Sequence, residues 1–117
     1  MEETIFHKII AGTSPADKVY EDERELVIKN IRPLAPVHLL LLPKKKAISS
    51  IKELSEEDRE LVGNLFLVAK KVAEEQGLAG YKLVFNVGRE GGQEIDYLHL
   101  HLLGGWEKGS GSENIAD

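Results

Sequence analysis

The sequence predicts a single α+β domain, because helical and extended patterns are mixed without the regular strand–helix–strand alternation of parallel-sheet proteins. Its 117 residues are the length of one domain. The composition is 42% hydrophobic and 30% charged, which is ordinary for a soluble globular protein. A chain of this size buries enough surface to fold without crosslinks. It contains no cysteine, which excludes disulfides, thiolate zinc sites and thiol nucleophiles.

The N-terminal part predicts a short helix followed by two strands. Apolar residues recur at helical spacing over residues 4–11, and Gly12 is a typical C-terminal stop. A short strand is expected at Val19-Tyr20, and a longer one from Leu26 to Ile31, after which two prolines interrupt the pattern.

The middle of the chain predicts a buried strand and a long helix. The nearly all-apolar run Val37–Leu42 is typical of a strand covered on both faces. Ser55, followed by three acidic residues, predicts a helix start, and the helix is expected to reach Gln76. Gly63 within it is either simply tolerated or marks the close approach of another backbone, such as that of a second subunit.

The C-terminal part predicts two strands around a glycine-rich loop. The strands are expected over Tyr81–Val87 and Tyr97–Leu103, and the loop spans Gly88–Gly92. Residues 1–107 are expected to form the domain. Residues 108–117, rich in glycine, serine and acidic residues, are expected to form a flexible tail.

The net charge and the hydropathy pattern disfavour some classes of binding partner. The net charge of −5 disfavours a broad nucleic-acid surface, which normally needs a basic face, but allows a local site for one small anion. No stretch approaches the roughly 20 apolar residues of a membrane span. The first residues are acidic, where a signal peptide is basic. We therefore expect a cytoplasmic protein that binds neither nucleic acid nor membranes.

The segment from Tyr97 to Leu103 carries the strongest chemical signal. Because side chains alternate across a strand, Tyr97, His99 and His101 share one face and the intervening leucines share the other, core face. Three interpretations remain open for the two imidazoles. In the first, both imidazoles are hydrogen-bonded structural groups. In the second, they bind a metal together with His38 and a carboxylate such as Glu94 or Asp96. Alternatively, one imidazole is a nucleophile whose charge development its neighbour stabilises.

Landmarks along nearly the whole chain resemble the histidine triad superfamily, and specifically its Hint-like branch of nucleotide-binding phosphoramidases. Those landmarks are Thr4–Ile10, Val19–Asp22, Ala35–His38, Pro43–Lys45, Gly80-Tyr81, Asn86, Gly91–Gln93, the His-x-His segment and Gly104-Gly105. The resemblance implies a five-stranded antiparallel sheet with one long and one short helix, and a two-fold dimer whose sheets join.

The resemblance also implies a reaction and a site. The middle triad histidine, here His99, attacks the α-phosphorus of a purine nucleoside phosphoramidate or adenylated amine, and water then releases the mononucleotide. His101 is implied to contact phosphate, His38 to support the site, and Glu94 to lie near the leaving group. The implied nucleotide-binding residues are Ile5, Phe6, Ile9, Ile28, Asn30, Ile31, Asn86, Gly92, Gln93 and Tyr97. Five of these residues match the apolar pocket for the base and are equally expected as ordinary core: Ile5, Phe6, Ile9, Ile28 and Ile31.

This sequence departs from the family at two site positions. Tyr97 stands where the triad has its first histidine, although the backbone carbonyl that orients the nucleophile survives that change. The Tyr97 hydroxyl is a candidate to replace the lost contact with His38. Asn30 stands where relatives usually carry an aspartate that accepts from both ribose hydroxyls, and an amide offers one uncharged acceptor. We therefore expect the activity to be retained, at or below the level that an intact triad supports.

No cofactor or metal is expected. In some relatives, two N-terminal cysteines, the companion histidine and the first triad histidine bind zinc, but here the cysteine positions are Thr4 and His7. Two other functions stay open: a non-catalytic purine mononucleotide-binding module, favoured by Tyr97 and Asn30, and a metal protein that uses His38, His99 and His101.

Overall fold

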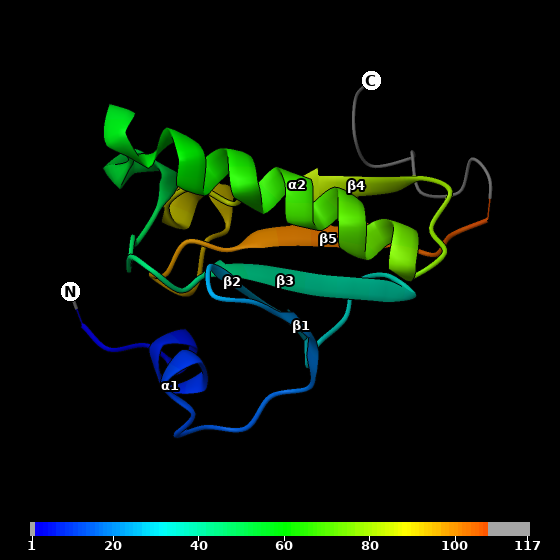
Figure 1. Cartoon of the computed structure of the whole chain (residues 1–117), viewed down its shortest axis with the longest axis horizontal. Coiled ribbons are helices and arrows are strands. Elements are labelled where there is room, and N and C mark those ends of the chain that lie inside the picture. The colour runs from blue at the N-terminus through cyan, green and yellow to red at the C-terminus, as the bar shows by residue number, and fades with distance from the viewer. Residues whose placement is uncertain (1, 108–117) are drawn as a thin grey trace.

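A five-stranded antiparallel sheet with strand order β1-β2-β3-β5-β4 forms the centre of the protein (Figure 1). The structure is a computed structural model that describes residues 2–107. The strands are β1 (Lys18–Glu21), β2 (Glu25–Lys29), β3 (Val37–Pro43), β4 (Tyr81–Val84) and β5 (Leu100–Gly104). The helices are α1 (Ile5–Ala11) and α2 (Arg59–Glu75), with short 3₁₀ turns at Ile51–Glu53, Glu56–Asp58 and Arg89–Gly91. The predicted α+β class, with one long and one short helix, is confirmed.

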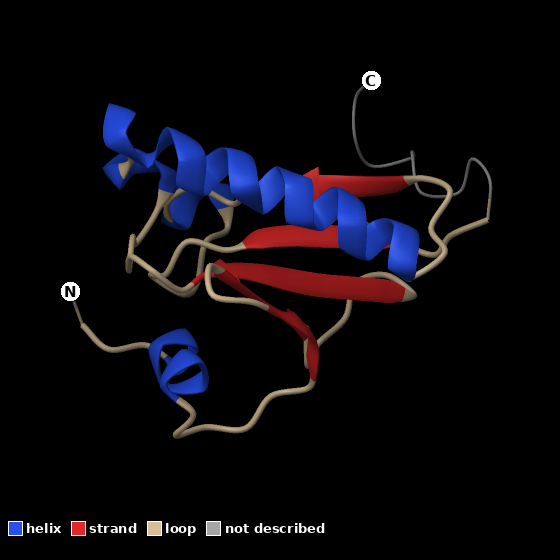
Figure 2. Cartoon of the chain, in the orientation of Figure 1, coloured by secondary structure: helices blue, strands red, loops and turns tan. Residues whose placement is uncertain are grey.

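The long helix α2 covers one face of the sheet (Figures 1 and 2). Its buried residues pack against the α2-facing side chains of β2, β3 and β5 in the larger of two cores. The helix starts later than predicted, because a 3₁₀ turn precedes Arg59. Within that turn, Ser55 and Asp58 form the capping box, and Lys46 forms an ion pair with Asp58.

The short helix α1 packs against the opposite face, where a second apolar cluster lies between α1, β2 and β3. The Thr4 hydroxyl accepts from the first backbone N–H groups of the helix, and the His7 ring accepts from the Thr4 N–H. Gly12 ends the helix with a φ of 83°, a left-handed conformation that glycine adopts without strain. The predicted start and stop of this helix are both confirmed.

Three strands end differently from the prediction. β2 stops at Lys29, so Asn30 and Ile31 lie in the following loop. β4 stops at Val84, three residues early. β5 begins only at Leu100, because the backbone N–H groups of Tyr97 and Leu98 donate to Ile95 O and Ile48 O rather than to a neighbouring strand. The first part of the His-x-His segment is therefore held outside the sheet.

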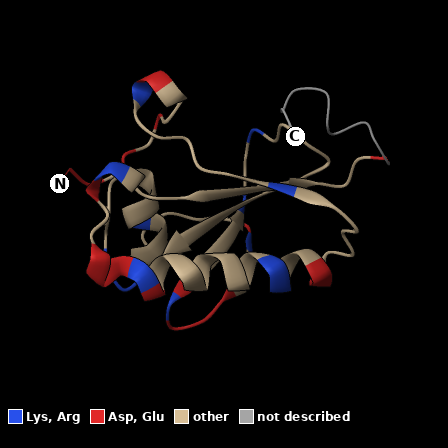
Figure 3. Ribbon diagram, turned by 90° about the horizontal axis from the view of Figure 1, so that it is seen from above, with Lys and Arg blue, Asp and Glu red and all other residues tan. Residues whose placement is uncertain are grey.

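Other features bear on the remaining expectations. Outside its own helix, a Cβ atom added at Gly63 would meet nothing within 4 Å, so no other part of residues 2–107 closely approaches it. In residues 2–107, no helix has the length and apolar character that a membrane crossing requires. Acidic and basic residues are interspersed along α2 (Figure 3). The predicted tail, residues 108–117, lies outside the described residues.

Candidate active site

Three of the four histidines gather on the α1-facing side of the sheet. The His99 and His101 rings are 5.0 Å apart between centroids, and the His38 and His101 rings are 5.2 Å apart. The antiparallel pairing of β3 with β5 brings His38 beside His101, although 63 residues separate them in the sequence. As predicted, Leu98, Leu100 and Leu102 lie on the other face, in the core beneath α2.

His99 is oriented as a nucleophile requires. Its Nδ1 lies 2.6 Å from the backbone oxygen of Tyr97, an acceptor, so Nδ1 carries the proton. The other nitrogen, Nε2, is left with its lone pair and has no hydrogen-bond partner among the described residues. Burial lowers the pKa of His99 below its usual 6.5, although the bond to Tyr97 O opposes part of this shift. The neutral, nucleophilic form is therefore favoured at neutral pH.

A chain of hydrogen bonds fixes the tautomer of His101. The Leu34 N–H donates to His38 Nδ1 over 3.0 Å, so the proton of His38 must lie on Nε2. His38 Nε2 in turn lies 2.9 Å from His101 Nδ1 and donates to it. His101 therefore carries its own proton on Nε2. Burial, with His99 and His38 nearby, lowers the pKa of His101 to about 4, so this ring is a neutral N–H donor.

Asn30 fits this chain less well than a carboxylate would. The Arg32 N–H donates to Asn30 Oδ1 over 2.9 Å, which turns the amide nitrogen Nδ2 toward His38 Nε2 at 3.2 Å. In the tautomer set by Leu34, both of these nitrogens are donors, so the contact adds no hydrogen bond. A carboxylate at this position would keep an acceptor for the Arg32 N–H and would turn an acceptor instead of a second donor toward His38 Nε2–H. The ribose role of Asn30 stays a prediction.

The Tyr97 side chain does not replace a triad histidine in contact with His38. Its hydroxyl donates to the backbone oxygen of Pro43 at the end of β3, and its ring packs edge-on against Phe6 and His7. His38 instead contacts His101, so the expected Tyr97–His38 contact is wrong. The two side chains lie apart because Tyr97 precedes β5 and lies near the last residue of β3, whereas His38 lies near the first residue of β3.

The glycine-rich loop is built from its own hydrogen bonds. The N–H groups of Gly91, Gly92 and Gln93 donate to carbonyl groups within the loop, so these three are not available to an anion. The buried Gln93 side chain donates to Ser49 O and Ile95 O and accepts from the Gly88 N–H. Asn86 donates to Gly91 O. Asn86, Gly92 and Gln93 thus stand beside one another, and the contacts of both side chains serve to shape the loop.

An ion pair that sequence reasoning missed closes this loop. Arg89 contacts both carboxylate oxygens of Asp96 at 3.0 Å, and also donates to Gln93 O. The only sign of this ion pair in the sequence was the opposite charge of Arg89 and Asp96, which are seven residues apart. Glu94, the candidate leaving-group residue, is exposed and forms no hydrogen bond or ion pair with the described residues.

The five residues expected to contact the base divide into two groups. Phe6, Ile9 and Ile28 are buried in the α1 core, and the Phe6 ring also lies 5.0 Å from the His99 ring. Ile5 is 45% exposed and Ile31 is 92% exposed, so these two are the ones accessible to a ligand. In the part of the chain that is described, no three His, Cys, Asp or Glu side chains converge in a metal-binding arrangement.

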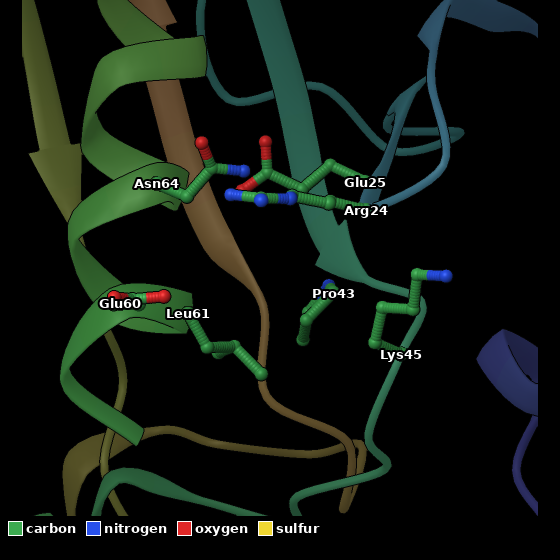
Figure 4. Close-up of a pocket in the computed structure, with 7 residues that line it drawn as sticks. All are labelled: Arg24, Glu25, Pro43, Lys45, Glu60, Leu61 and Asn64. Carbon is green, nitrogen blue, oxygen red and sulfur yellow. The ribbon is translucent and has the colours of Figure 1, made fainter. Parts of the chain in front are cut away.

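A separate pocket of about 160 Å³ lies on the α2 side of the sheet, away from the histidines. It is lined by Arg24, Glu25, Pro43, Lys45, Glu60, Leu61 and Asn64 (Figure 4). Glu25 is only 1% exposed, and neither of its carboxyl oxygens has a hydrogen-bond partner of normal geometry. Burial, then the charge of Asp22, raises the pKa of Glu25 to about 7. No sequence pattern predicted this buried acid.

Comparison with known proteins agrees with the resemblance seen in the sequence. Residues 3–116 match the family model described as "Scavenger mRNA decapping enzyme C-term binding". The chain is 43% identical over 106 residues to the purine nucleoside phosphoramidase of Escherichia coli strain K12, covering 89% of this chain and 88% of that protein.

Solved structures share the fold as well as the sequence. A HIT family hydrolase from Legionella pneumophila is 48% identical with a TM-score of 0.87, covering 90% of this chain and 95% of that one. A histidine triad protein from Clostridium difficile is 38% identical with a TM-score of 0.85, covering 92% and 96%. These matches span nearly the whole chain, and the chain therefore belongs to the histidine triad (HIT) family.

Proposed function

We propose that this protein is a nucleotide-binding hydrolase that cleaves purine nucleoside phosphoramidates or adenylated amines at the α-phosphorus. The observation that carries the proposal is the 2.6 Å contact between His99 Nδ1 and Tyr97 O, which leaves the lone pair of Nε2 free in a site with a second imidazole. Relatives named as HIT family hydrolase and purine nucleoside phosphoramidase support the reaction class.

The reaction proceeds in two displacements. In the first, a bond forms between His99 Nε2 and the α-phosphorus, the phosphorus–nitrogen bond breaks, and the leaving amine takes up a proton. In the second, water attacks the nucleotidyl-histidine and gives a proton to the conjugate base of the acid that protonated the amine. The histidine–phosphorus bond breaks, and the mononucleotide and free His99 are released. Glu94 is the candidate acid for the amine, because it is exposed and lies one residue beyond the buried Gln93.

His101 and His38 support the charge that develops on phosphorus. A neutral His101 with its proton on Nε2 donates to a phosphate oxygen without repelling a protonated neighbour. His38 contributes through His101, because its Nε2–H holds His101 Nδ1 as an acceptor. Each step uses groups of the protein, so no cofactor is required.

The test is mononucleotide release from adenosine phosphoramidate by the wild type, by His99→Ala, and by the wild type with a chelator. We expect release by the wild type, no loss with chelator, and a fall of at least about 10³-fold in the variant, because a nucleophile has been removed. Release that survives in His99→Ala contradicts the histidine mechanism. Release that the chelator abolishes favours the metal alternative.

A non-catalytic purine mononucleotide-binding module is the second candidate. The observation that favours it is the Asn30 amide, which faces His38 as a second donor and has its oxygen already occupied by the Arg32 N–H. Titration with AMP separates the two functions: AMP binding without turnover by the folded wild type favours the module.

We also propose that the protein is a homodimer joined through β4 and α2. β4 is an edge strand, and its Tyr81 is partly exposed. On the neighbouring surface of α2, Leu67 is 68% exposed and Phe66 is 42% exposed. Gly63 lies one turn before Leu67, where its missing side chain permits a close approach. Beside its pairing with β5, β4 has one edge without a neighbouring strand, and such an edge next to exposed apolar side chains is a surface on which a second chain can pair.

A further inference from the structure

We infer that Tyr97 is a positioning residue for the nucleophile: its hydroxyl, bound to the backbone oxygen of Pro43, holds in place the carbonyl group that orients His99. This inference rests on the proposed function and concerns the side chain of Tyr97, whereas the orienting carbonyl belongs to its backbone.

No regular strand pairing holds the Tyr97 carbonyl group in place. β5 begins at Leu100, three residues beyond Tyr97. The Tyr97 N–H closes a turn onto Ile95 O, and the Leu98 N–H donates to Ile48 O in a loop. The peptide that must present an oxygen to His99 therefore depends on contacts other than regular strand pairing for its position.

The Tyr97 side chain supplies one contact of this kind. Its hydroxyl donates to the oxygen of Pro43, the last residue of β3 and 54 residues away in the sequence. Because β3 is the central strand, this bond ties the irregular segment to the most buried part of the sheet. Tyr97 is itself only 2% exposed, so water does not readily replace the bond.

Two neighbouring rings restrict the movement of the Tyr97 ring and therefore of its hydroxyl. The His7 ring packs edge-on at 4.8 Å between centroids, and the Phe6 ring at 6.3 Å. Phe6 also contacts the His99 ring at 5.0 Å, so one aromatic side chain touches both the anchor and the nucleophile. Burial raises the pKa of Tyr97 to about 12, and the hydroxyl stays a donor throughout the working pH range.

The chemical consequence is a fixed proton on His99. The Tyr97 carbonyl accepts from Nδ1, which keeps the Nε2 lone pair available. If the hydroxyl anchor is lost, the carbonyl gains freedom to move and the ring spends less time in the reactive tautomer and orientation. Small misplacements of reacting groups lower the catalytic rate much more than they lower substrate binding.

The decisive variant is Tyr97→Phe, which removes the hydroxyl and keeps the ring. Tyr20→Phe is the matched control, because it also removes a tyrosine hydroxyl bond, here to Asp22 on the far edge of the sheet. Tyr97→Met adds a second comparison, since a flexible apolar side chain fills the space and supplies no hydroxyl donor. Thermal unfolding establishes that each variant is folded, and steady-state kinetics with adenosine phosphoramidate gives kcat and KM separately.

A second readout does not depend on activity. Long-range ¹H–¹⁵N spectra report which nitrogen of His99 carries the proton. We expect wild type and Tyr20→Phe to show protonated Nδ1, and Tyr97→Phe to show a mixture of tautomers together with a kcat about tenfold lower and little change in KM.

Each outcome decides a different point. Wild-type kcat and a wild-type His99 spectrum in folded Tyr97→Phe overturn the inference. If the wild type releases no mononucleotide, the proposed function fails, but the spectra still test whether the hydroxyl positions His99. If Tyr97→Phe does not fold, a folded Tyr97→Met variant with wild-type kcat and tautomer overturns the inference, and one with the mixed tautomers and lowered kcat supports it.

Discussion

The substitution Glu25→Gln is expected to stabilise the protein at alkaline pH and to leave it little changed at acidic pH. Glu25 begins β2, and its side chain lies between the sheet and α2, facing Asn64 (Figure 4). Its two oxygens are buried without a hydrogen-bond partner of normal geometry, and the surrounding charges are mixed. Asn64 and Arg24 favour the charged carboxylate, whereas burial and Asp22 disfavour it more strongly.

The magnitude follows from the two protonation states. The pKa of Glu25 rises from 4.5 in the unfolded chain to about 7 in the folded protein. At about 1.4 kcal/mol for each pH unit, the difference corresponds to about 3 kcal/mol. Between these pKa values the folded state holds a proton that the unfolded state has released, so stability falls as the pH rises. The contribution is fully present below pH 4.5 and is lost once the pH exceeds about 7.

The assay is urea unfolding of wild type and variant at several values between pH 5 and pH 8. Other groups also titrate in this range, so the quantity to follow is the difference in unfolding free energy between the two proteins. It should move in favour of Glu25→Gln by about 2–3 kcal/mol across the range, because glutamine cannot ionise. Glu60→Gln is the matched control, since it removes a negative charge from the exposed side of the same pocket.

A difference that stays constant from pH 5 to pH 8 would refute the reasoning. It would mean that Glu25 binds its proton equally in both states, as happens if water or a movement of Arg24 solvates the carboxylate. A trend of the same size in Glu60→Gln would also count against it, because the effect would then come from net charge rather than from burial.

Two further predictions concern turnover and assembly. The rate of AMP release should be level between pH 7 and pH 8 and fall only below pH 6.5, because burial lowers the pKa of His99 and protonation removes its nucleophilic lone pair; an acid limb centred above pH 7 would contradict this assignment. Leu67→Glu should convert the proposed dimer to a monomer in sedimentation velocity, because it places a charge in the exposed apolar surface of α2. Lys18→Glu, on the opposite edge strand, is the control, and an unchanged dimer in Leu67→Glu would place the interface elsewhere.

The elements that local interactions specify could be predicted from the sequence. The helix α1 is bounded by Thr4 and Gly12, whose capping groups act within a few residues of the chain. The alternation of histidines and leucines in the last strand likewise separated a polar face from a core face correctly, because alternation is a property of extended backbone itself.

The ends of strands could not be predicted in the same way, because they depend on a partner. Tyr97 and His99 continue the alternating pattern of β5, yet the N–H groups of Tyr97 and Leu98 bond to Ile95 and Ile48. The sequence therefore indicated the candidate residues of the site and the carbonyl group that orients His99, whereas tertiary structure decided where the regular strand begins and which contacts hold that carbonyl in place.

Long-range packing also decided the contacts that no local pattern encodes. Only the pairing of β3 with β5 joins His38 to His101, and only the end of β3 offers the Tyr97 hydroxyl its acceptor. Glu25 is an unremarkable charged residue in the sequence, and it is buried because α2 crosses above it. The sequence by itself indicated the family, the order of the helices and strands, and the candidate histidines of the site. Their tautomers, their hydrogen-bond partners and the protonation of Glu25 follow from which side chains the fold brings together and shields from water.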